Sequence, residues 1–136
     1  MSLEIKRFLY SWIDLIFNPF FLAASSNFLN LIEFLKRYFV RNVVEPIKYH
    51  VKAKKYLARN KRYFSTLSEA SKVSLKLQGG IMDDKEAKNF EGNEFFEDSI
   101  KLRKFDEGAK KADLKIKSIH EYKNLLTSKL IWSLII

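Results

Sequence analysis

The sequence predicts an all-α protein of six or seven helices, and three observations support this fold class. Only four Gly and two Pro occur among 136 residues, which is too few for the tight turns of an all-β chain. Lys, Leu, Glu, Phe and Ile dominate the chain, a composition that favours helices. Apolar residues also recur mainly at spacings of three and four, the period of one helix face.

Residues 15–32 form an apolar stretch without a charged side chain, long enough to raise the question of a membrane span. Polar residues such as Asn18 and Asn27 make insertion into a bilayer costly, so we expect core or interface helices that separate at Pro19. A membrane-associated segment and a segment without a regular fold are the alternatives. The likeness to a signal peptide is interrupted by Asp14.

Two helices are predicted next along the chain. The first covers residues 27–40, where the apolar positions define a wide face, and it breaks near Arg41. The second carries Pro46 in its first turn, where the missing N–H is tolerated, and runs to about residue 59.

Asn60 is expected to begin a short link to the following helix. Ser65 or Thr66 can cap that helix, and Thr66 and Glu69 have the spacing of a capping box; the helix should stop at about residue 77. A Gly-Gly pair at 79–80 is a strong terminator and could also let backbone amides approach an anion.

Three further helices are predicted after this terminator. Asp83 or Asp84 caps a helix that runs to about residue 90. Residues 94–111 show the most regular apolar spacing, and residues 118–136 form a last helix with a very apolar end.

The residue types that are absent or rare limit the possible chemistry. No Cys occurs, which excludes disulfides, thiolate metal sites and a cysteine nucleophile, and is compatible with a cytoplasmic location. The two histidines, His50 and His120, are too few for a His-rich metal cage from one chain. His120 has no partner at ligand spacing, so we expect it at the surface.

The positive charge is concentrated in one part of the chain. Residues 45–77 contain nine Lys or Arg and two Glu, a balance of +7, whereas the whole chain has a net charge of +9. Such a patch attracts phosphate groups, whether in nucleic acid, in anionic lipid or in a small substrate.

Two sets of side chains could carry chemistry. His50 and Lys54 are four residues apart, so on a helix they share one face, where an imidazole could bind a metal and an ammonium could hold an anion. Arg103, Asp106 and Lys110 also share a face, and flanking cations keep a carboxylate ionised, as a metal ligand must be. The alternatives are a solvated lysine run and a surface ladder of salt bridges.

Four stretches between residues 44 and 126 resemble, in order and spacing, the C-terminal half of a known bacterial family. They read EPIKYHVKAKKYL, YFSTLSEASKVSLKLQGGIM, FEGNEFFEDSIKLRKFDEGAK and HEYKNLL. The family comprises HD-domain phosphohydrolases and phosphonate-degradation diiron oxygenases, which are related to inositol oxygenases. The resemblance covers about 80 residues.

The resemblance implies a partial HD-domain helical bundle around a two-metal centre, with iron in the oxygenase branch. Of the family's four histidine and two aspartate ligands, His50 matches the last histidine and Asp106 the last aspartate. Lys54 matches the lysine that holds a phosphonate or phosphate, and Arg103 matches an arginine on the face of the metal aspartate. Ser74 and Gln78 match polar substrate contacts.

The chain departs from the family upstream of this match. Residues 1–43 contain no histidine and form a hydrophobic helical segment without likeness, residues 44–126 form the HD-type half, and residues 127–136 form an apolar tail. We therefore expect an incomplete iron centre, no catalytic residue and no activity of the isolated chain, with a retained phosphate- or phosphonate-binding pocket. Whether the chain is part of an enzyme stays open. It could be a truncated gene product, a decayed paralogue, or a subunit completed by a complementary chain or by a second copy.

Two other functions are compatible with the residues. A basic helical module could bind nucleic acid, with Tyr49, Tyr56, Tyr63 and Phe64 as stacking surfaces, although we regard nucleic acid as the weaker choice of partner. A module that binds a membrane surface or a partner protein could use the apolar stretches near both ends.

Overall fold

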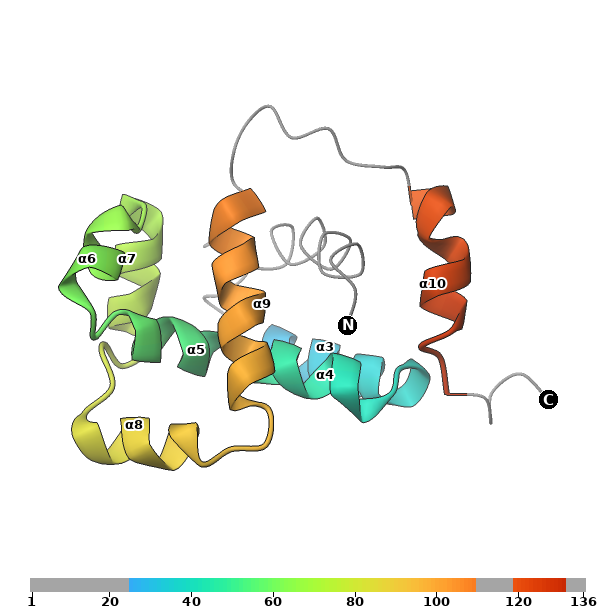
Figure 1. Ribbon diagram of the computed structural model, residues 1–136, viewed down its shortest axis with the longest axis horizontal. Coiled ribbons are helices and arrows are strands. Elements are labelled where there is room, and N and C mark those ends of the chain that lie inside the picture. Colours follow the sequence, from blue (N-terminus) through green and yellow to red (C-terminus); the bar gives the residue numbers. More distant parts are fainter. Residues whose placement is uncertain (1–24, 110–118, 132–136) are drawn as a thin grey trace. The chain divides into compact units, whose positions relative to one another are not determined.

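The computed structural model describes residues 25–109 and 119–131, and the regular elements in these ranges are helices. In chain order they are α3 (Ser25–Tyr38), α4 (Arg41–Lys48), α5 (His50–Leu57), α6 (Lys61–Thr66), α7 (Glu69–Leu77), α8 (Asp84–Glu91), α9 (Phe96–Ala109), the 3₁₀ helix η1 (Ile119–Tyr122) and α10 (Lys123–Thr127), shown in Figure 1. The predicted all-α class is confirmed. None of the helices in these ranges is both long and apolar enough to cross a membrane.

The chain divides into two compact units. The central unit is Glu45–Arg103, and the terminal unit contains the described residues before and after it. Within the terminal unit, the segment after α3 pairs with the segment after α10 through an isolated antiparallel bridge between Phe39 and Leu130. Two backbone hydrogen bonds flank this bridge, from Val40 N to Lys129 O at 3.1 Å and from Ile131 N to Tyr38 O at 2.9 Å.

One hydrophobic cluster of the central unit joins α5, α8 and α9. Its buried members are Ala53, Met82, Phe90 and Ile100. The partly buried rings of Tyr56 and Phe96 meet edge to face, with centroids 5.1 Å apart, and Phe90 meets Phe96 at 5.2 Å. Edge-to-face pairs of this kind stabilise a core beyond the area that they bury, by about 0.5–1.5 kcal/mol each.

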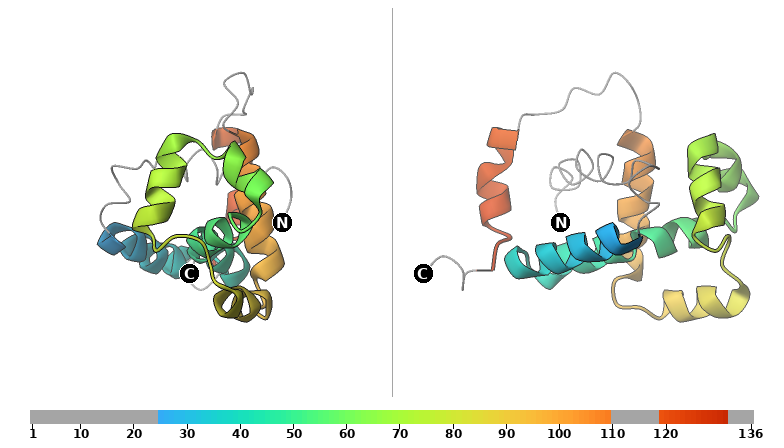
Figure 2. Two further views of the ribbon diagram at one scale, coloured as in Figure 1. Left: turned by 90° about the vertical axis from the view of Figure 1, so that its left-hand side faces the viewer. Right: turned by 180° about the vertical axis from the view of Figure 1, so that it is seen from behind.

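A second cluster lies where α6 leads into α7. Ala58, Leu67 and Leu75 are buried there, and Tyr63 and Phe64 of α6 pack against them. The two short helices, green in Figure 2, are joined only by Leu67 and Ser68. This packing explains how a helix as short as α6 is held, because isolated helices of that length are unstable in water.

Two predicted helix ends are confirmed in detail. Asp83 and Glu86 form a capping box at the start of α8, with Glu86 N 2.7 Å from the Asp83 carboxylate. At the end of α7, Gly80 N donates to Leu75 O at 2.9 Å and Gly79 N to Lys76 O at 3.2 Å. This Schellman pattern requires positive φ, and the two glycines have φ of 92° and 76°.

The prediction for Pro46 was wrong. A helix begins at Arg41 and contains Pro46 in its interior, and the break falls at Tyr49, which separates α4 from α5. Helical hydrogen bonds continue on both sides of the break, from Tyr49 N to Glu45 O and from Ala53 N to Tyr49 O. Burial of apolar side chains such as Val44 outweighs the hydrogen bond that proline removes.

The segment after Asn60 is a helix instead of the predicted link. Asn60 caps α6, because its side-chain oxygen accepts hydrogen bonds from Arg62 N at 2.9 Å and Tyr63 N at 3.2 Å. The predicted capping box at Thr66 was wrong, since Thr66 lies inside α6 and Ser68 caps α7. Ser, Thr and Asn occur too close together here for spacing alone to choose the cap.

The predicted helix over 118–136 is shorter and interrupted. After η1, helix α10 ends at Thr127, and Leu130 then pairs with Phe39 as an extended segment. Residues 132–136 and the helices predicted within residues 1–24 lie outside the described residues. His120 is exposed, as predicted.

Candidate anion-binding site

Helix α5 buries two of the predicted site residues. His50 and Lys54 lie one turn apart and are 2% and 4% exposed. Lysine is rarely buried to this degree, because removing an ammonium from water carries a large free-energy cost unless polar groups surround it. Neither side chain therefore belongs to a solvated lysine run, whereas the neighbouring Lys52 is exposed.

Arg103 of α9 reaches the histidine. Its Nη1 lies 2.9 Å from His50 Nε2, and the arginine side chain is 4% exposed. A guanidinium can only donate hydrogen bonds, so His50 Nε2 is the acceptor and the ring proton is on Nδ1. In this arrangement the imidazole is neutral, and the lone pair of Nε2 is directed at a cation that the chain itself supplies.

Lys54 reaches a second helix, α7. Its Nζ donates a hydrogen bond of 2.8 Å to Ser74 Oγ, and Ser74 Oγ donates in turn to Ser71 O at 3.0 Å. Because its own proton is committed to Ser71, the Ser74 hydroxyl is oriented to accept from the ammonium. The predicted residues Lys54 and Ser74, twenty positions apart in sequence, are thus in direct contact.

Gln78 follows Ser74 by one turn at the C-cap of α7, so the two residues share a helix face. Its side-chain oxygen is buried and accepts no hydrogen bond from any described residue. A buried amide oxygen without a donor is destabilising, by about 1–3 kcal/mol. The position suits a ligand that carries a hydroxyl or amine donor.

Asp106 falls in the terminal unit, three residues after Arg103 on α9, and is 3% exposed. Its predicted role as a metal ligand stays a prediction. Lys110, which was expected on the same face, lies outside the described residues.

The central unit therefore places two buried cationic side chains and a neutral imidazole on three helices. Lys54 and Arg103 are linked through α5, because Arg103 contacts His50 and Lys54 follows His50 by one turn. Positive charge in a region of low dielectric favours an anion much more strongly than the same charge at a surface. The hydroxyl of Ser74 adds a further polar group to this cluster.

Sequence reasoning missed one member of the cluster. The hydroxyl of Tyr63 accepts a hydrogen bond of 3.0 Å from Arg103 Nε. The sequence offered no signal for it, because Tyr63 lies forty residues from Arg103 in a segment that was expected to be a link.

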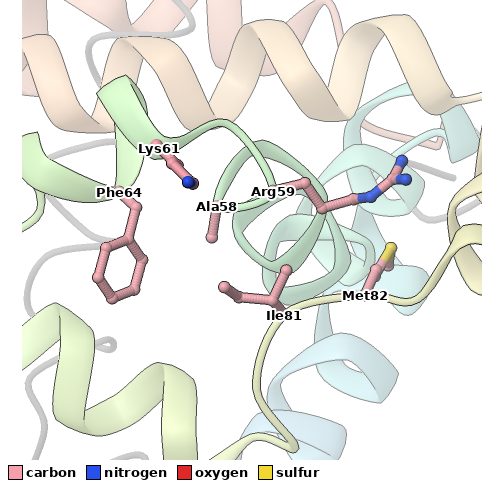
Figure 3. Close-up of a pocket in the computed structure, with 6 residues that line it drawn as sticks. All are labelled: Ala58, Arg59, Lys61, Phe64, Ile81 and Met82. Atoms are coloured by element: carbon pink, nitrogen blue, oxygen red, sulfur yellow. The ribbon is translucent and has the colours of Figure 1, made fainter.

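A separate pocket of about 380 Å³ lies where α5, α6 and the segment before α8 meet. Its lining includes Ala58, Phe64, Ile81 and Lys61, and the side chains of Phe64 and Ile81 point toward one another (Figure 3). None of the predicted site residues lines it. Arg59, at its edge, forms an ion pair with Asp84.

The residues present do not fit the two-metal centre that the resemblance implies. Within the described ranges, no group of three or more His, Cys, Asp and Glu side chains could hold a metal ion. The one buried imidazole directs Nε2 at Arg103, and a metal there would have to displace the guanidinium. The whole chain has only one other histidine, and it is exposed.

Comparison with known proteins places this cluster in context. The chain is 46% identical over 89 residues to a hydroxymethylphosphonate dioxygenase of Gimesia maris. It is also 46% identical over 83 residues to a [1-hydroxy-2-(trimethylamino)ethyl]phosphonate dioxygenase of Leisingera caerulea. The chain is similar to phosphonate dioxygenases. An uncharacterized protein of Acanthamoeba polyphaga mimivirus is 36% identical over 93 residues.

The likeness to phosphonate dioxygenases confirms the predicted resemblance, and it has a clear extent. It covers 65% and 60% of this chain but only 44% and 42% of the two dioxygenases. The chain therefore spans less than half the length of the curated relatives it matches. No family model matches the chain.

Proposed function

We propose that the central unit binds a small molecule with a phosphonate or phosphate group, and that Lys54 and Arg103 supply the charge. The observation that carries this proposal is the burial of both cations next to hydroxyl groups, with Lys54 Nζ 2.8 Å from Ser74 Oγ. A phosphonate oxygen accepts strong charge-assisted hydrogen bonds from both an ammonium and a guanidinium. Each side chain comes from a different helix, so an anion between them would also tie the helices together.

The names of the two dioxygenase relatives refine the proposed ligand. Both names describe a phosphonate with a hydroxyl group on the carbon that is bonded to phosphorus. A hydroxyl is the donor that the buried oxygen of Gln78 needs, so Gln78 is proposed to accept from it. Ser74, oriented by Ser71, is proposed to help hold the Lys54 ammonium toward the phosphonate.

The proposal does not include oxygenation by this chain alone. His50 and Asp106 are the two positions that match the family's metal ligands, and too few donors give weak or no iron binding. We propose that any iron centre, with His50 and Asp106 as two of its ligands, needs further donors from a complementary chain or a second copy of this chain. Truncation, the division at residues 43 and 126 and a cytoplasmic location likewise stay predictions.

The nucleic-acid alternative receives less support. Its proposed stacking rings, Tyr49, Tyr56, Tyr63 and Phe64, are partly buried against the two hydrophobic clusters. Stacking with bases requires exposed ring faces. The stretches behind the membrane-surface alternative fall largely outside the described residues.

Calorimetric titration with hydroxymethylphosphonate tests the proposal. The Lys54→Met variant keeps the aliphatic stem but removes the charge, and binding should weaken about ten- to hundredfold, the usual effect of losing a charge-assisted hydrogen bond. Lys52→Met is the matched control, since it removes the same group from an exposed position two residues earlier. Equal affinities of the wild type and Lys54→Met, or no binding by the wild type, would contradict the proposal.

A further inference from the structure

Tyr63 is the one member of the cluster that the sequence did not predict for this site, and its hydroxyl contacts Arg103, one of the two cations that the proposed function uses. Arg103 Nε donates to Tyr63 Oη at 3.0 Å while Arg103 Nη1 donates to His50 Nε2 at 2.9 Å. A guanidinium carries five N–H donors in one plane. Fixing two of those donors therefore fixes the directions of the other three.

The tyrosine is itself held from two sides. Its backbone N–H is one of the two that the Asn60 side chain caps at the start of α6. Its ring packs against the cluster of Ala58, Leu67 and Leu75. Because both the backbone and the ring are restrained, the hydroxyl can act as a fixed acceptor for the guanidinium.

We infer that Tyr63 is a positioning residue for anion binding, which acts by holding the plane of the Arg103 guanidinium. The inference rests on the proposed function, because it takes a phosphonate or phosphate as the ligand of Arg103. It adds a residue that does not touch the ligand. Without the Tyr63 hydroxyl, the guanidinium loses one of the contacts that fix its plane, and anion binding must then restrict more of its motion.

The variant Tyr63→Phe tests the inference, since it keeps the ring in the hydrophobic cluster and removes only the hydroxyl. We expect its affinity for hydroxymethylphosphonate to fall about three- to tenfold, the size of effect of one typical intramolecular hydrogen bond, because Tyr63 acts on the anion only through Arg103. Tyr56→Phe is the matched control, because the Tyr56 hydroxyl bonds to the exposed carboxylate of Glu91 at 2.7 Å. The affinity of the control should match that of the wild type.

A double-mutant cycle separates positioning from a general structural effect. If Tyr63 acts through the guanidinium, Tyr63→Phe should cause no further loss of affinity in an Arg103→Met background. A loss of the same size in that background would overturn the inference. So would an unchanged affinity of Tyr63→Phe alone.

A measurement without ligand keeps the two proposals distinguishable. In NMR spectra, the Nε–H proton of Arg103 should exchange with water at least several-fold faster in Tyr63→Phe than in the wild type. Unchanged exchange would show that the contact is absent and would overturn the inference alone. No phosphonate binding by the wild type would overturn the proposed function and, with it, the role assigned to Tyr63.

Discussion

Two basic side chains of the described residues are buried, which is unusual for charged residues. Lys54, within the basic stretch 45–77, and Arg103, outside it, are each 4% exposed. The other eight basic residues of that stretch are at least partly exposed. Both have oriented neutral partners, Ser74 for the lysine and Tyr63 with His50 for the arginine. These hydroxyl and imidazole groups satisfy part of the hydrogen-bonding capacity of the two cations, as burial of a charged side chain requires.

The exposed hydrogen bond of Tyr56 gives a prediction for pH dependence. Its hydrogen bond to the Glu91 carboxylate, together with burial, raises the pKa of the Tyr56 phenol above the usual 10.0. A raised pKa means that the protonated phenol is favoured by folding, so its contribution to stability is complete below pH 10 and disappears as the pH rises through the folded-state pKa.

The titration of tyrosine absorbance checks this prediction. Subtracting the curve of Tyr56→Phe from that of the wild type isolates the Tyr56 phenol, which should ionise above pH 10.0. Glu91→Gln should bring its pKa back toward the usual value, because the carboxylate is the main cause of the shift. Ionisation of Tyr56 below pH 10 in the wild type would contradict the prediction.

At the scale of the elements, the end of α7 is set by two glycines. Ser74 and Gln78 lie in its last two turns, and the chain then reverses through Gly79 and Gly80. The reversal ends α7 at its C-cap Gln78, which shares a helix face with Ser74 because the two are four residues apart. A helix continuing past residue 78 would lose this sharp turn.

Two glycine substitutions should therefore change stability in opposite directions. Gly79→Ala should lower the free energy of unfolding by about 1–2 kcal/mol, because alanine is strained at the φ of 92° found there. Gly108→Ala should raise it by about 0.5–1 kcal/mol, because Gly108 lies within α9 and an added Cβ meets no atom of the described residues within 4 Å. Urea unfolding measures both, and the same sign for both variants would contradict this account.

At the scale of the whole molecule, the number of metal ions that the chain binds distinguishes a complete two-metal centre from an incomplete one. The likeness to dioxygenases covers less than half of those relatives. Among the described residues, no three His, Cys, Asp or Glu side chains lie close enough together to hold a metal ion. A metal at His50 Nε2 would also have to replace the guanidinium of Arg103.

We expect the purified chain to take up far less than two irons. The test is anaerobic addition of iron(II), removal of the excess and measurement of iron per chain. Phosphonate binding should be the same before and after treatment with a chelator, because the proposed contacts come from Lys54 and Arg103. Two tightly held irons per chain, or a loss of phosphonate binding with the chelator, would contradict the expectation.

Part of the fold followed from local patterns. The cap of α8, predicted at Asp83 or Asp84 and found at Asp83, and the end of α7 before Gly79 depend on residues within five positions of each other, so local patterns predicted both. The position of Pro46 inside a helix, and the formation of α6 in place of a link, depended on packing against residues distant in the sequence. Local rules put a helix start at Pro46 and a link after Asn60, and burial of apolar side chains decided otherwise.

The same division applies to the candidate site. Sequence alone determined the all-α class, the absence of cysteine chemistry, the basic stretch and, through a family resemblance, the identity of His50, Lys54, Ser74 and Arg103 as residues of interest. Only the tertiary structure decided which of them meet and that Tyr63 joins them. The physical reason is that periodicity fixes which residues share a helix face, whereas contacts between helices depend on how those faces pack.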